Sequence, residues 1–419
     1  MTRSLDAVDR DLFAQVMDSS NRANPYPLYA RLRETPVIRS EDGLYIVSTF
    51  EEIRSLLLNP KASSQVVQRL AFPSTGNVFK DWIVNPIMSR IMQRHRSLVF
   101  RDPPEHTGLR RHVMLQFSPE RMQRMKGRVA ALVDDLIAGM QGKQEIDLVE
   151  SFSYPLPVAA ICELLGVPPQ DEKKFHVWSK SLIAALDFQQ EIDPEIMKRL
   201  AVDNAAISAY LGALIKEKRR SPKDDVLSGL ATCRDPKAGR LNRFDLMTTA
   251  VSLLIAGHET TVCLINNGML ALLREPQLLE RLRQDPGLAP RLVDEILRFD
   301  PPAHFMRRKA LEDIDIAGAR IPKGAMLVLV LASGNRDPRR FADPDRLDPD
   351  RPNNQHLGFG VGLHACVGAW LARLETEAAL LALSQRLIRP RLVEDPPPYR
   401  STAAVRGLER LLISIDGVT

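Results

Sequence analysis

The chain is short of cysteine, of aromatic residues and of long apolar runs. Its four cysteines show no Cys-x-x-Cys spacing, which argues against a disulfide framework and a structural zinc site; they are Cys162, Cys233, Cys263 and Cys366. A net charge of +5 and 5% aromatic residues provide neither the basic stripe nor the stacking surface of a nucleic-acid binder. The longest apolar stretches, at 251–256 and 327–332, are too short to cross a bilayer, and the N-terminus has no apolar run typical of a signal peptide or membrane anchor. We therefore expect a cytoplasmic protein with no nucleic-acid or membrane partner.

The spacing of apolar residues predicts a mainly α fold with a small β portion. With 44% apolar residues, the chain can fill a sizeable core. Helical periodicity is present at 120–140, 202–220, 242–274 and 376–386, and the segment 242–274 is apolar enough to run through that core. Short strand signals occur at 45–47, 315–324 and 326–331. No repeat or clean boundary divides the chain, so we expect residues 1–419 to form a single large domain.

One cysteine stands in a glycine-rich loop. Four glycines lie around Cys366 between Gly358 and Gly368, and the residues that follow are helix formers. Cys366 is therefore predicted at, or just before, the start of a helix, where the helix dipole lowers the pKa of the thiol and stabilises a thiolate. Such a thiolate can ligate a metal ion. The alternative from the residues alone is a buried structural cysteine beside a turn.

A polar cluster interrupts the long apolar helix at Ala256-Gly257-His258-Glu259-Thr260-Thr261. One interpretation is a local kink, because glycine costs about 1 kcal/mol in a helix interior and threonine can bond the carbonyl four residues earlier. The other is an acid–alcohol pair, Glu259 and Thr260, that delivers protons through water.

These two segments resemble motifs of the cytochrome P-450 family. The spacing Phe-x-x-Gly-x-x-x-Cys-x-Gly at 359–368 is similar to the family's haem-binding signature, and Ala-Gly-x-Glu-Thr-Thr at 256–261 is similar to its distal helix. The resemblance spans roughly 100–415, with five motifs in order, and implies a long distal helix over a haem b. It further implies that Cys366 is the axial metal ligand, Phe359 and Gly360 line the thiolate side, and Gly368 lets the following helix approach the macrocycle. His364 would meet a propionate, Ala256 would border the sixth coordination site, Thr260 would hold bound oxygen and Glu259 would supply protons.

The remaining motifs complete the predicted site. His106 and Arg110, one helical turn apart, and Arg308, with Arg307 as the fallback, are implied to bind the haem propionates. Glu295, Arg298 and Arg351 are implied to form a structural charge network under the cysteine loop. The implied substrate pocket contains Ser252, Ala256, His304, Met306 and Ala404, and the segment 65–96 corresponds to a variable active-site loop.

The resemblance implies a haem-thiolate monooxygenase that hydroxylates or epoxidises a mostly apolar small molecule. No flavin or iron–sulfur segment occurs in the chain, so two electrons must come from outside, from a ferredoxin-type donor with its reductase. The alternatives are a peroxide-driven enzyme of the same fold and a non-catalytic haem-binding sensor; the Glu259–Thr260 pair argues against both. A cysteine nucleophile with His364 as base is disfavoured, since two residues apart on a loop is poor geometry.

Overall fold

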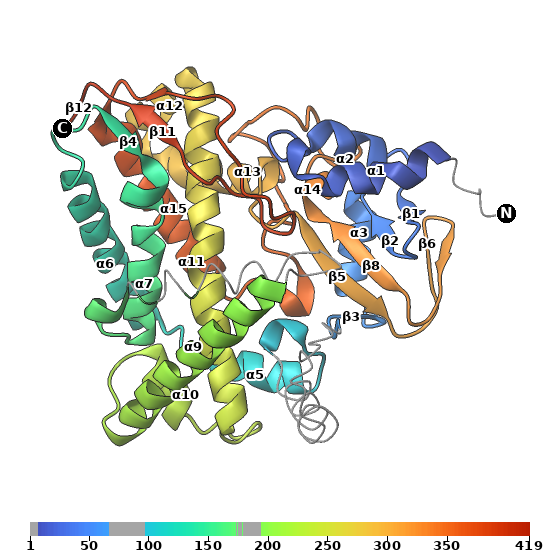
Figure 1. The fold of residues 1–419 in the computed structure, drawn as a ribbon, viewed down its shortest axis with the longest axis horizontal. Coiled ribbons are helices and arrows are strands. Elements are labelled where there is room, and N and C mark those ends of the chain that lie inside the picture. The colour runs from blue at the N-terminus through green and yellow to red at the C-terminus, as the bar shows by residue number, and fades with distance from the viewer. Residues whose placement is uncertain (1–6, 67–96, 173, 175–177, 179–193) are drawn as a thin grey trace.

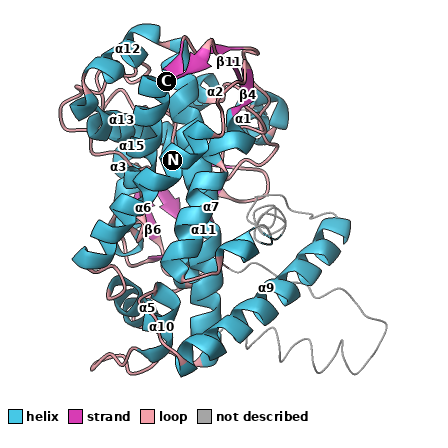
Figure 2. Ribbon diagram, turned by 90° about the vertical axis from the view of Figure 1, so that its left-hand side faces the viewer, coloured by secondary structure: helices cyan, strands magenta, loops and turns pink. Residues whose placement is uncertain are grey.

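The computed structural model describes residues 7–66, 97–172, 174, 178 and 194–419. Helices α6, α7, α11 and α15 gather on one side of the molecule, and strands β2, β5 and β8 lie on the other beside the N-terminal helices α1 and α2 (Figure 1). Helix dominates the chain (Figure 2), as predicted.

The α-helices are α1 Ala7–Met17, α2 Tyr26–Leu32, α3 Phe50–Leu58, α5 Glu105–Met114, α6 Pro119–Ala138, α7 Pro155–Leu165, α9 Pro194–Arg220, α10 Val226–Thr232, α11 Arg243–Arg274, α12 Pro276–Gln284, α13 Ala289–Phe299, α14 Leu331–Gly334 and α15 Ala369–Arg386. Short helical turns are η1 Ser19–Asn21, η3 Leu98–Phe100, η4 Val149–Ser153, η5 Pro169–Asp171, η6 Pro286–Leu288 and η7 Gly362–His364. The strands are β1 Val37–Arg39, β2 Tyr45–Val47, β3 Ala62–Ser63, β4 Glu145–Asp147, β5 Phe305–Ala310, β6 Ile314–Ile316, β7 Ala319–Ile321, β8 Met326–Val330, β9 Leu387–Ile388, β10 Arg391–Leu392, β11 Leu412–Ser414 and β12 Gly417–Val418.

Helix α11 runs through the main core, as its apolar sequence predicts. The Asn242 side chain caps its first turn by accepting a hydrogen bond from the Asp245 amide, and the helix ends just before Pro276. By length and composition α11 could cross a bilayer, yet it is packed against α7, α9 and α15, as a core helix is. It therefore serves as the central wall against which the site is built.

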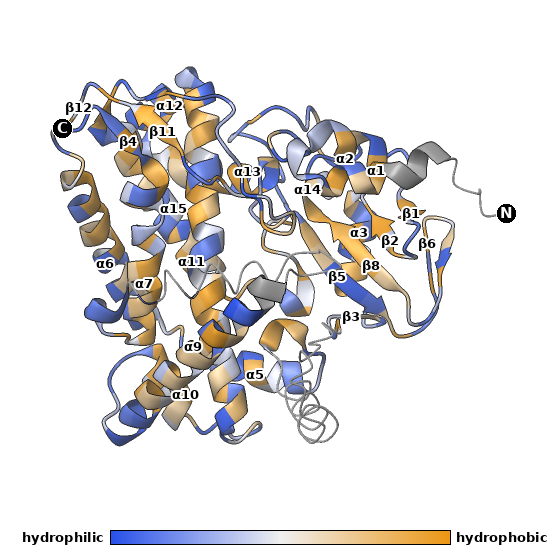
Figure 3. Ribbon diagram, viewed as in Figure 1, coloured by the Kyte–Doolittle hydropathy of each residue, from blue (hydrophilic) through white to orange (hydrophobic). Residues whose placement is uncertain are grey.

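A mixed sheet positions strand β5. Within the described chain its order is β1-β2-β8-β5-β3, with β2 and β8 parallel and the other neighbours antiparallel. Strand β8 is buried along most of its length and is hydrophobic throughout (Figure 3). Because side chains alternate along a strand, Met306 and Arg308 share one face of β5 and Arg307 takes the other. The predicted strands at 45–47 and 326–331 are β2 and β8.

A smaller sheet joins the C-terminal segment to the helices. In the described residues β11 lies between β10 and β4, pairing Ile413 with Ile146. This sheet was not predicted from the sequence. It fixes both ends of the loop from 393 to 411, which passes beside α11.

Candidate active site

Cys366 lies in a tight loop between η7 and α15. Gly360 and Gly362 adopt left-handed φ angles of 64° and 75°. The Cys366 amide donates a hydrogen bond to the Phe359 carbonyl at 2.9 Å, and the Gly360 amide donates to Leu357 at 2.8 Å. A Cβ on Gly362 would lie 2.8 Å from a methyl carbon of Leu58 in α3. The loop therefore packs against α3 on one side and leads into α15 on the other, with Cys366 just before the start of α15.

The pKa of the Cys366 thiol differs from the sequence prediction. Burial raises this pKa, and the Gly368 amide, Arg110 and Arg373 lower it to a smaller extent. The residue as a whole is nevertheless exposed. The prediction that the helix start alone would depress the pKa is wrong, because desolvation outweighs the dipole. A bound metal ion would remove the proton outright.

The Phe359 ring lies beside the Arg373 guanidinium and the His356 ring. The Arg373 guanidinium lies 4.6 Å from the centre of the Phe359 ring, and the His356 ring centre lies 5.9 Å away. Asp294 of α13 accepts a hydrogen bond from Arg373 Nε at 2.8 Å. Helix α13 thus orients the residues that flank the ring.

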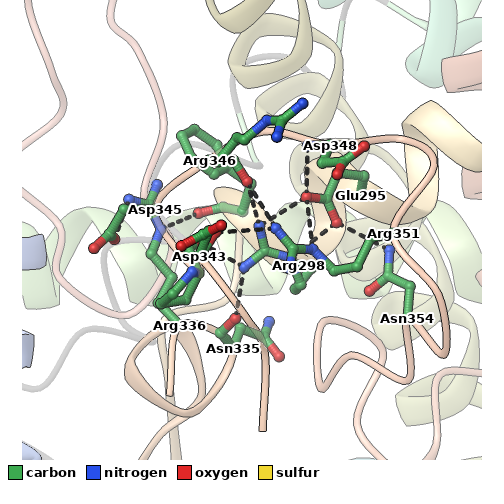
Figure 4. A network of polar contacts seen from close by, with 12 residues as sticks. Glu295, Arg298, Asn335, Arg336, Asp343, Asp345, Arg346, Asp348, Arg351 and Asn354 are labelled. Carbon is green, nitrogen blue, oxygen red and sulfur yellow. Dashed lines mark hydrogen bonds and ion pairs between the residues drawn. The ribbon is translucent and has the colours of Figure 1, made fainter. Parts of the chain in front are cut away.

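Below the loop, Glu295 and Arg298 of α13 form a fully buried ion pair (Figure 4). Arg298 donates to both Glu295 carboxylate oxygens, at 2.8 and 2.7 Å, and to the carbonyls of Asn335, Pro344 and Arg346. Arg351 Nε reaches Glu295 at 3.2 Å. The structure therefore brings together the three residues predicted for this network.

The network is connected to the cysteine loop by Asn335. Its side-chain amide donates to the Leu297 carbonyl at 3.1 Å, and its side-chain oxygen accepts from the Leu357 amide at 2.7 Å. Leu357 directly precedes the glycine-rich segment. The buried charges consequently fix where the loop begins.

Four donor side chains converge near Cys366. The His106 and His364 ring centres are 4.2 Å apart, and Arg110 donates to the Ala365 carbonyl at 2.8 Å. Both His106 ring nitrogens and Arg308 Nη2 are buried without a hydrogen-bond partner. The Asp102 carboxylate acts electrostatically on this cluster, but its hydrogen bonds come from Ser63 and Ser64. Unpaired buried donors are costly, so the cluster is complementary to a further anion that would accept hydrogen bonds from it.

The pKa values in this cluster indicate the same complementarity. The pKa of His364 is lowered to about 4, first by burial and then by His106, Arg308 and Arg110. Burial also lowers the pKa of Arg308 to about 10. Because Arg308 acts on His364 and the alternation of β5 directs Arg307 to the other face, Arg308 is the arginine that belongs to the cluster. The donor set fits the two propionates of a haem, with Cys366 placed where its sulfur would ligate the iron.

On α11, Ser252, Ala256 and Thr260 are spaced four residues apart and share one face. Ala256 is exposed, whereas Leu254, His258 and Glu259 near it on the helix are buried. The Thr260 hydroxyl donates to the Ala256 carbonyl at 3.0 Å, the back-bond that the sequence suggested. A Cβ on Gly257 would lie 2.7 Å from Ile161 Cδ1, so this glycine permits close packing of α7.

Glu259 turns toward the C-terminal segment. Its carboxylate forms an ion pair with Arg400, and its second oxygen lies 3.8 Å from His258 Nε2. His258 Nδ1 is 2.6 Å from the Leu254 carbonyl. Glu259 and Thr260 are therefore adjacent in sequence but engage different partners.

The residues predicted to line a substrate pocket have different environments. The Ser252 hydroxyl bonds Ser97 at 2.7 Å, and Met306 Cε lies 4.0 Å from where a Gly360 Cβ would be. The Ala404 carbonyl accepts from the His304 amide at 3.1 Å. Most of the predicted variable loop, 67–96, lies outside the described residues.

His304 does not belong with this set. Its ring is buried, with Nδ1 2.8 Å from the Tyr29 hydroxyl and Nε2 3.8 Å from Asp300. Asp300 in turn pairs with Arg406 at 2.5 Å. His304 is therefore not a pocket residue. Its contacts with Tyr29 of α2 and with Asp300 make it part of a buried structural cluster.

Comparisons with known proteins agree with this geometry. The cytochrome P450 family model matches residues 62–286 and 288–402. Cytochrome P450 107B1 of Saccharopolyspora erythraea is 36% identical over 96% of this chain and 95% of its own length. Vitamin D(3) 25-hydroxylase of Pseudonocardia autotrophica is 36% identical over 94% of both chains. The crystal structure of P450BioI with an acyl carrier protein superposes with a TM-score of 0.85 at 32% identity, covering 95% of this chain and 99% of the other.

The chain belongs to the cytochrome P450 family. It is a haem-thiolate monooxygenase, an oxidoreductase with haem b as its cofactor, which uses a redox partner and acts on a small molecule. These findings confirm the predicted family, fold class, activity and cofactor.

Two residues that contact the site were not predicted from the sequence. Arg373 stacks on Phe359, and its position on the predicted helix after Cys366 could have indicated this. Arg400 pairs with Glu259 across 141 residues of sequence, and no local signal indicated it.

Proposed function

We propose that residues 1–419 act as a single domain that inserts one atom of dioxygen into a C–H or C=C bond of a mostly apolar small molecule. For hydroxylation, substrate, dioxygen, two electrons and two protons give the alcohol and one water. The observation that carries this proposal is the placement of Cys366 beside four converging donors, with the Ser252–Thr260 face of α11 as the distal wall.

The residues proposed to hold the haem are those of the converging cluster. Cys366 would be its axial ligand, and His106, Arg110, Arg308 and His364 would bind its propionates. Phe359 would pack on the thiolate side. Gly360 and Gly368 are proposed to leave room for the macrocycle, because a Cβ on Gly368 would already contact the Cys366 sulfur at 4.0 Å. When bound, thiolate-ligated haem iron supplies oxygen activation.

Thr260 and Glu259 are proposed to deliver protons to the site. The Thr260 hydroxyl donates to the Ala256 carbonyl and can accept a hydrogen bond from water, and the small Ala256 side chain leaves space next to it. Glu259 lies one residue away, buried but paired with the half-buried Arg400, and can exchange protons with solvent on that side.

The substrate is proposed to be a sizeable apolar molecule. Ala256, Met306 and Ala404 offer apolar surface, and Ser252 offers one hydroxyl. Two relatives are consistent with this class: one is named a vitamin D(3) hydroxylase, and P450BioI was crystallised with a hexadecenoic acid carried by acyl carrier protein.

The electron donor is proposed to be a cytoplasmic ferredoxin served by its reductase, docking on the cysteine side. Arg111 is 39% exposed there, with its guanidinium 3.6 Å from the buried Asp235 carboxylate. Met114, Leu115, Leu363 and Trp370 are exposed apolar side chains on α5 and around the cysteine loop. An acidic donor would be attracted by the arginine and bury the apolar groups. Ferredoxin affinity should weaken with salt and with Arg111→Ala, but not with Arg320→Ala on β7. Affinity unaffected by salt and by Arg111→Ala would reject this docking surface.

Turnover with isotopically labelled dioxygen tests the reaction itself. One labelled atom should appear in the product and two electrons should be consumed per product molecule. Activity that requires peroxide and fails with electron donors would instead indicate the peroxide-driven alternative.

A further inference from the structure

Arg400 lies between the buried Glu259 carboxylate and solvent. It belongs to the C-terminal loop between β10 and β11, where its amide donates to the Gly407 carbonyl at 3.0 Å. Its guanidinium forms an ion pair with Glu259, and the exposed side-chain fractions are 23% for Arg400 and 8% for Glu259. A proton that travels from solvent to Glu259 on this side must pass the guanidinium.

Within the described part of the chain, Arg400 is the permanently charged partner of Glu259. His258 stands 3.8 Å from the other Glu259 oxygen and is charged only when protonated; its ring packs edge-on against Tyr154 at 6.1 Å. Burial lowers the pKa of Arg400, whereas Tyr154, Glu409 and Glu150 raise it. An arginine stays protonated under all ordinary conditions, so the pairing persistently favours the ionised carboxylate.

A carboxylate held in this way cannot carry a proton until the pair opens. We propose that Arg400 is a positioning residue that keeps Glu259 ionised and turned away from Thr260, and that opening of the Arg400–Glu259 pair admits each proton. This inference rests on the proposed proton role of Glu259 and assigns the control of that role to the C-terminal loop.

The step is a proton transfer in which Arg400 keeps its own charge. The guanidinium swings aside, a hydronium ion or buffer acid of the bulk solvent protonates the Glu259 carboxylate through water at the loop, and its conjugate base stays in the solvent. The neutral acid then turns toward Thr260 and donates that proton through water. The regenerated carboxylate pairs with Arg400 again.

A purely structural role is the competing explanation, since the pair also joins the C-terminal loop to α11. A structural variant would lose stability or haem without changing the pH response of Glu259. The two roles are therefore separated by pH dependence and by double substitution.

The test uses the haem-loaded enzyme with its redox partners and compares Arg400→Gln, Arg400→Lys, Glu259→Gln and the double variant Glu259→Gln/Arg400→Gln. Arg410→Gln is the matched control, because it removes the same charge from the same loop at an exposed pair with Glu394. Two quantities are measured against pH: product formed per electron pair, and the infrared carbonyl band of Glu259, identified by its absence in Glu259→Gln.

We expect Arg400→Gln to raise the pH midpoint of the Glu259 band by about 1–3 units, the effect of removing a nearby opposite charge. The coupling profile should move with it, while Arg400→Lys and Arg410→Gln stay near wild type. In the Glu259→Gln background, Arg400→Gln should have no further effect on coupling. An unshifted midpoint, or the same loss of coupling in the Glu259→Gln background, overturns the role of Arg400.

Two outcomes keep this inference distinct from the proposed function. If Glu259→Gln couples like wild type, the proton role of Glu259 fails and the inference fails with it. If Glu259→Gln uncouples but Arg400→Gln shifts nothing, only the inference fails. If Arg400→Gln does not fold, the infrared carbonyl band of Glu259 in the wild-type enzyme tests the proposal. A Glu259 carboxyl that is already protonated at neutral pH would contradict it.

Discussion

Arg298→Met should lower the free energy of unfolding by a large part of its total value. Arg298 is fully buried and donates five hydrogen bonds, two of them to the equally buried Glu295. Methionine fills the volume but leaves the Glu295 carboxylate without its main partner and three backbone carbonyls with fewer donors. Breaking a buried pair from one side costs about 3–5 kcal/mol, out of a typical stability of about 5–15 kcal/mol.

The loss should be measured by urea unfolding followed by circular dichroism, together with the ratio of haem to protein. Because Asn335 connects Arg298 to Leu357 at the start of the cysteine loop, the haem ratio should fall as well. Arg320→Met is the matched control: its pair with Asp313 is exposed at 72% and 43%, so it should cost about 0–1 kcal/mol. Adding Glu295→Gln to Arg298→Met should recover part of the loss by removing the stranded charge. An Arg298→Met variant within about 1 kcal/mol of wild type would refute this account of the network.

Three further variants test other parts of the site. Thr260→Ala should keep electron consumption but lower product per electron pair, whereas Thr248→Ala, which removes a similar back-bonded hydroxyl on α11, should not; equal coupling in both would count against Thr260. Arg308→Met should speed haem loss about tenfold or more, and Arg307→Met should have little effect; the reverse order would show that Arg307 is the propionate ligand. The pKa of His304 is lowered from 6.5 to about 4, mainly by burial, so the folded state disfavours its charged form and stability is lost as pH falls from about 6.5 toward 4. His304→Gln should reduce this pH-dependent loss in the free energy of unfolding by about 3 kcal/mol at most. Urea unfolding at several pH values measures the loss, and an unchanged pH dependence would contradict the neutral, buried state assigned to His304.

Short-range signals predicted much of this molecule. The cap at Asn242 and the proline at 276 set the ends of α11 within one residue of the expected helix, and the spacing of Glu295 and Arg298 placed both on one buried face. Gly360 and Gly362 indicated the turns that place Cys366 at the head of α15. In each case the determining residues are close together in the chain.

Contacts between distant segments could not be predicted in this way. The pairing of β4 with β11 and the Arg400–Glu259 pair depend on how the C-terminal segment packs on α11. His304 was assigned to the pocket by its position, but the Tyr29 hydroxyl of α2 fixes its ring elsewhere. The pKa of Cys366 was misjudged because burial, which a sequence does not give, outweighs the helix start.

The central claim is that Cys366 ligates the haem iron as a thiolate. The most direct test is the absorption difference spectrum of the reduced protein with carbon monoxide, recorded for wild type and for Cys366→Ala. The account predicts the red-shifted band of thiolate-ligated haem in wild type and its loss in the variant. A wild-type spectrum typical of histidine-ligated haem, or a band that survives Cys366→Ala, would contradict it.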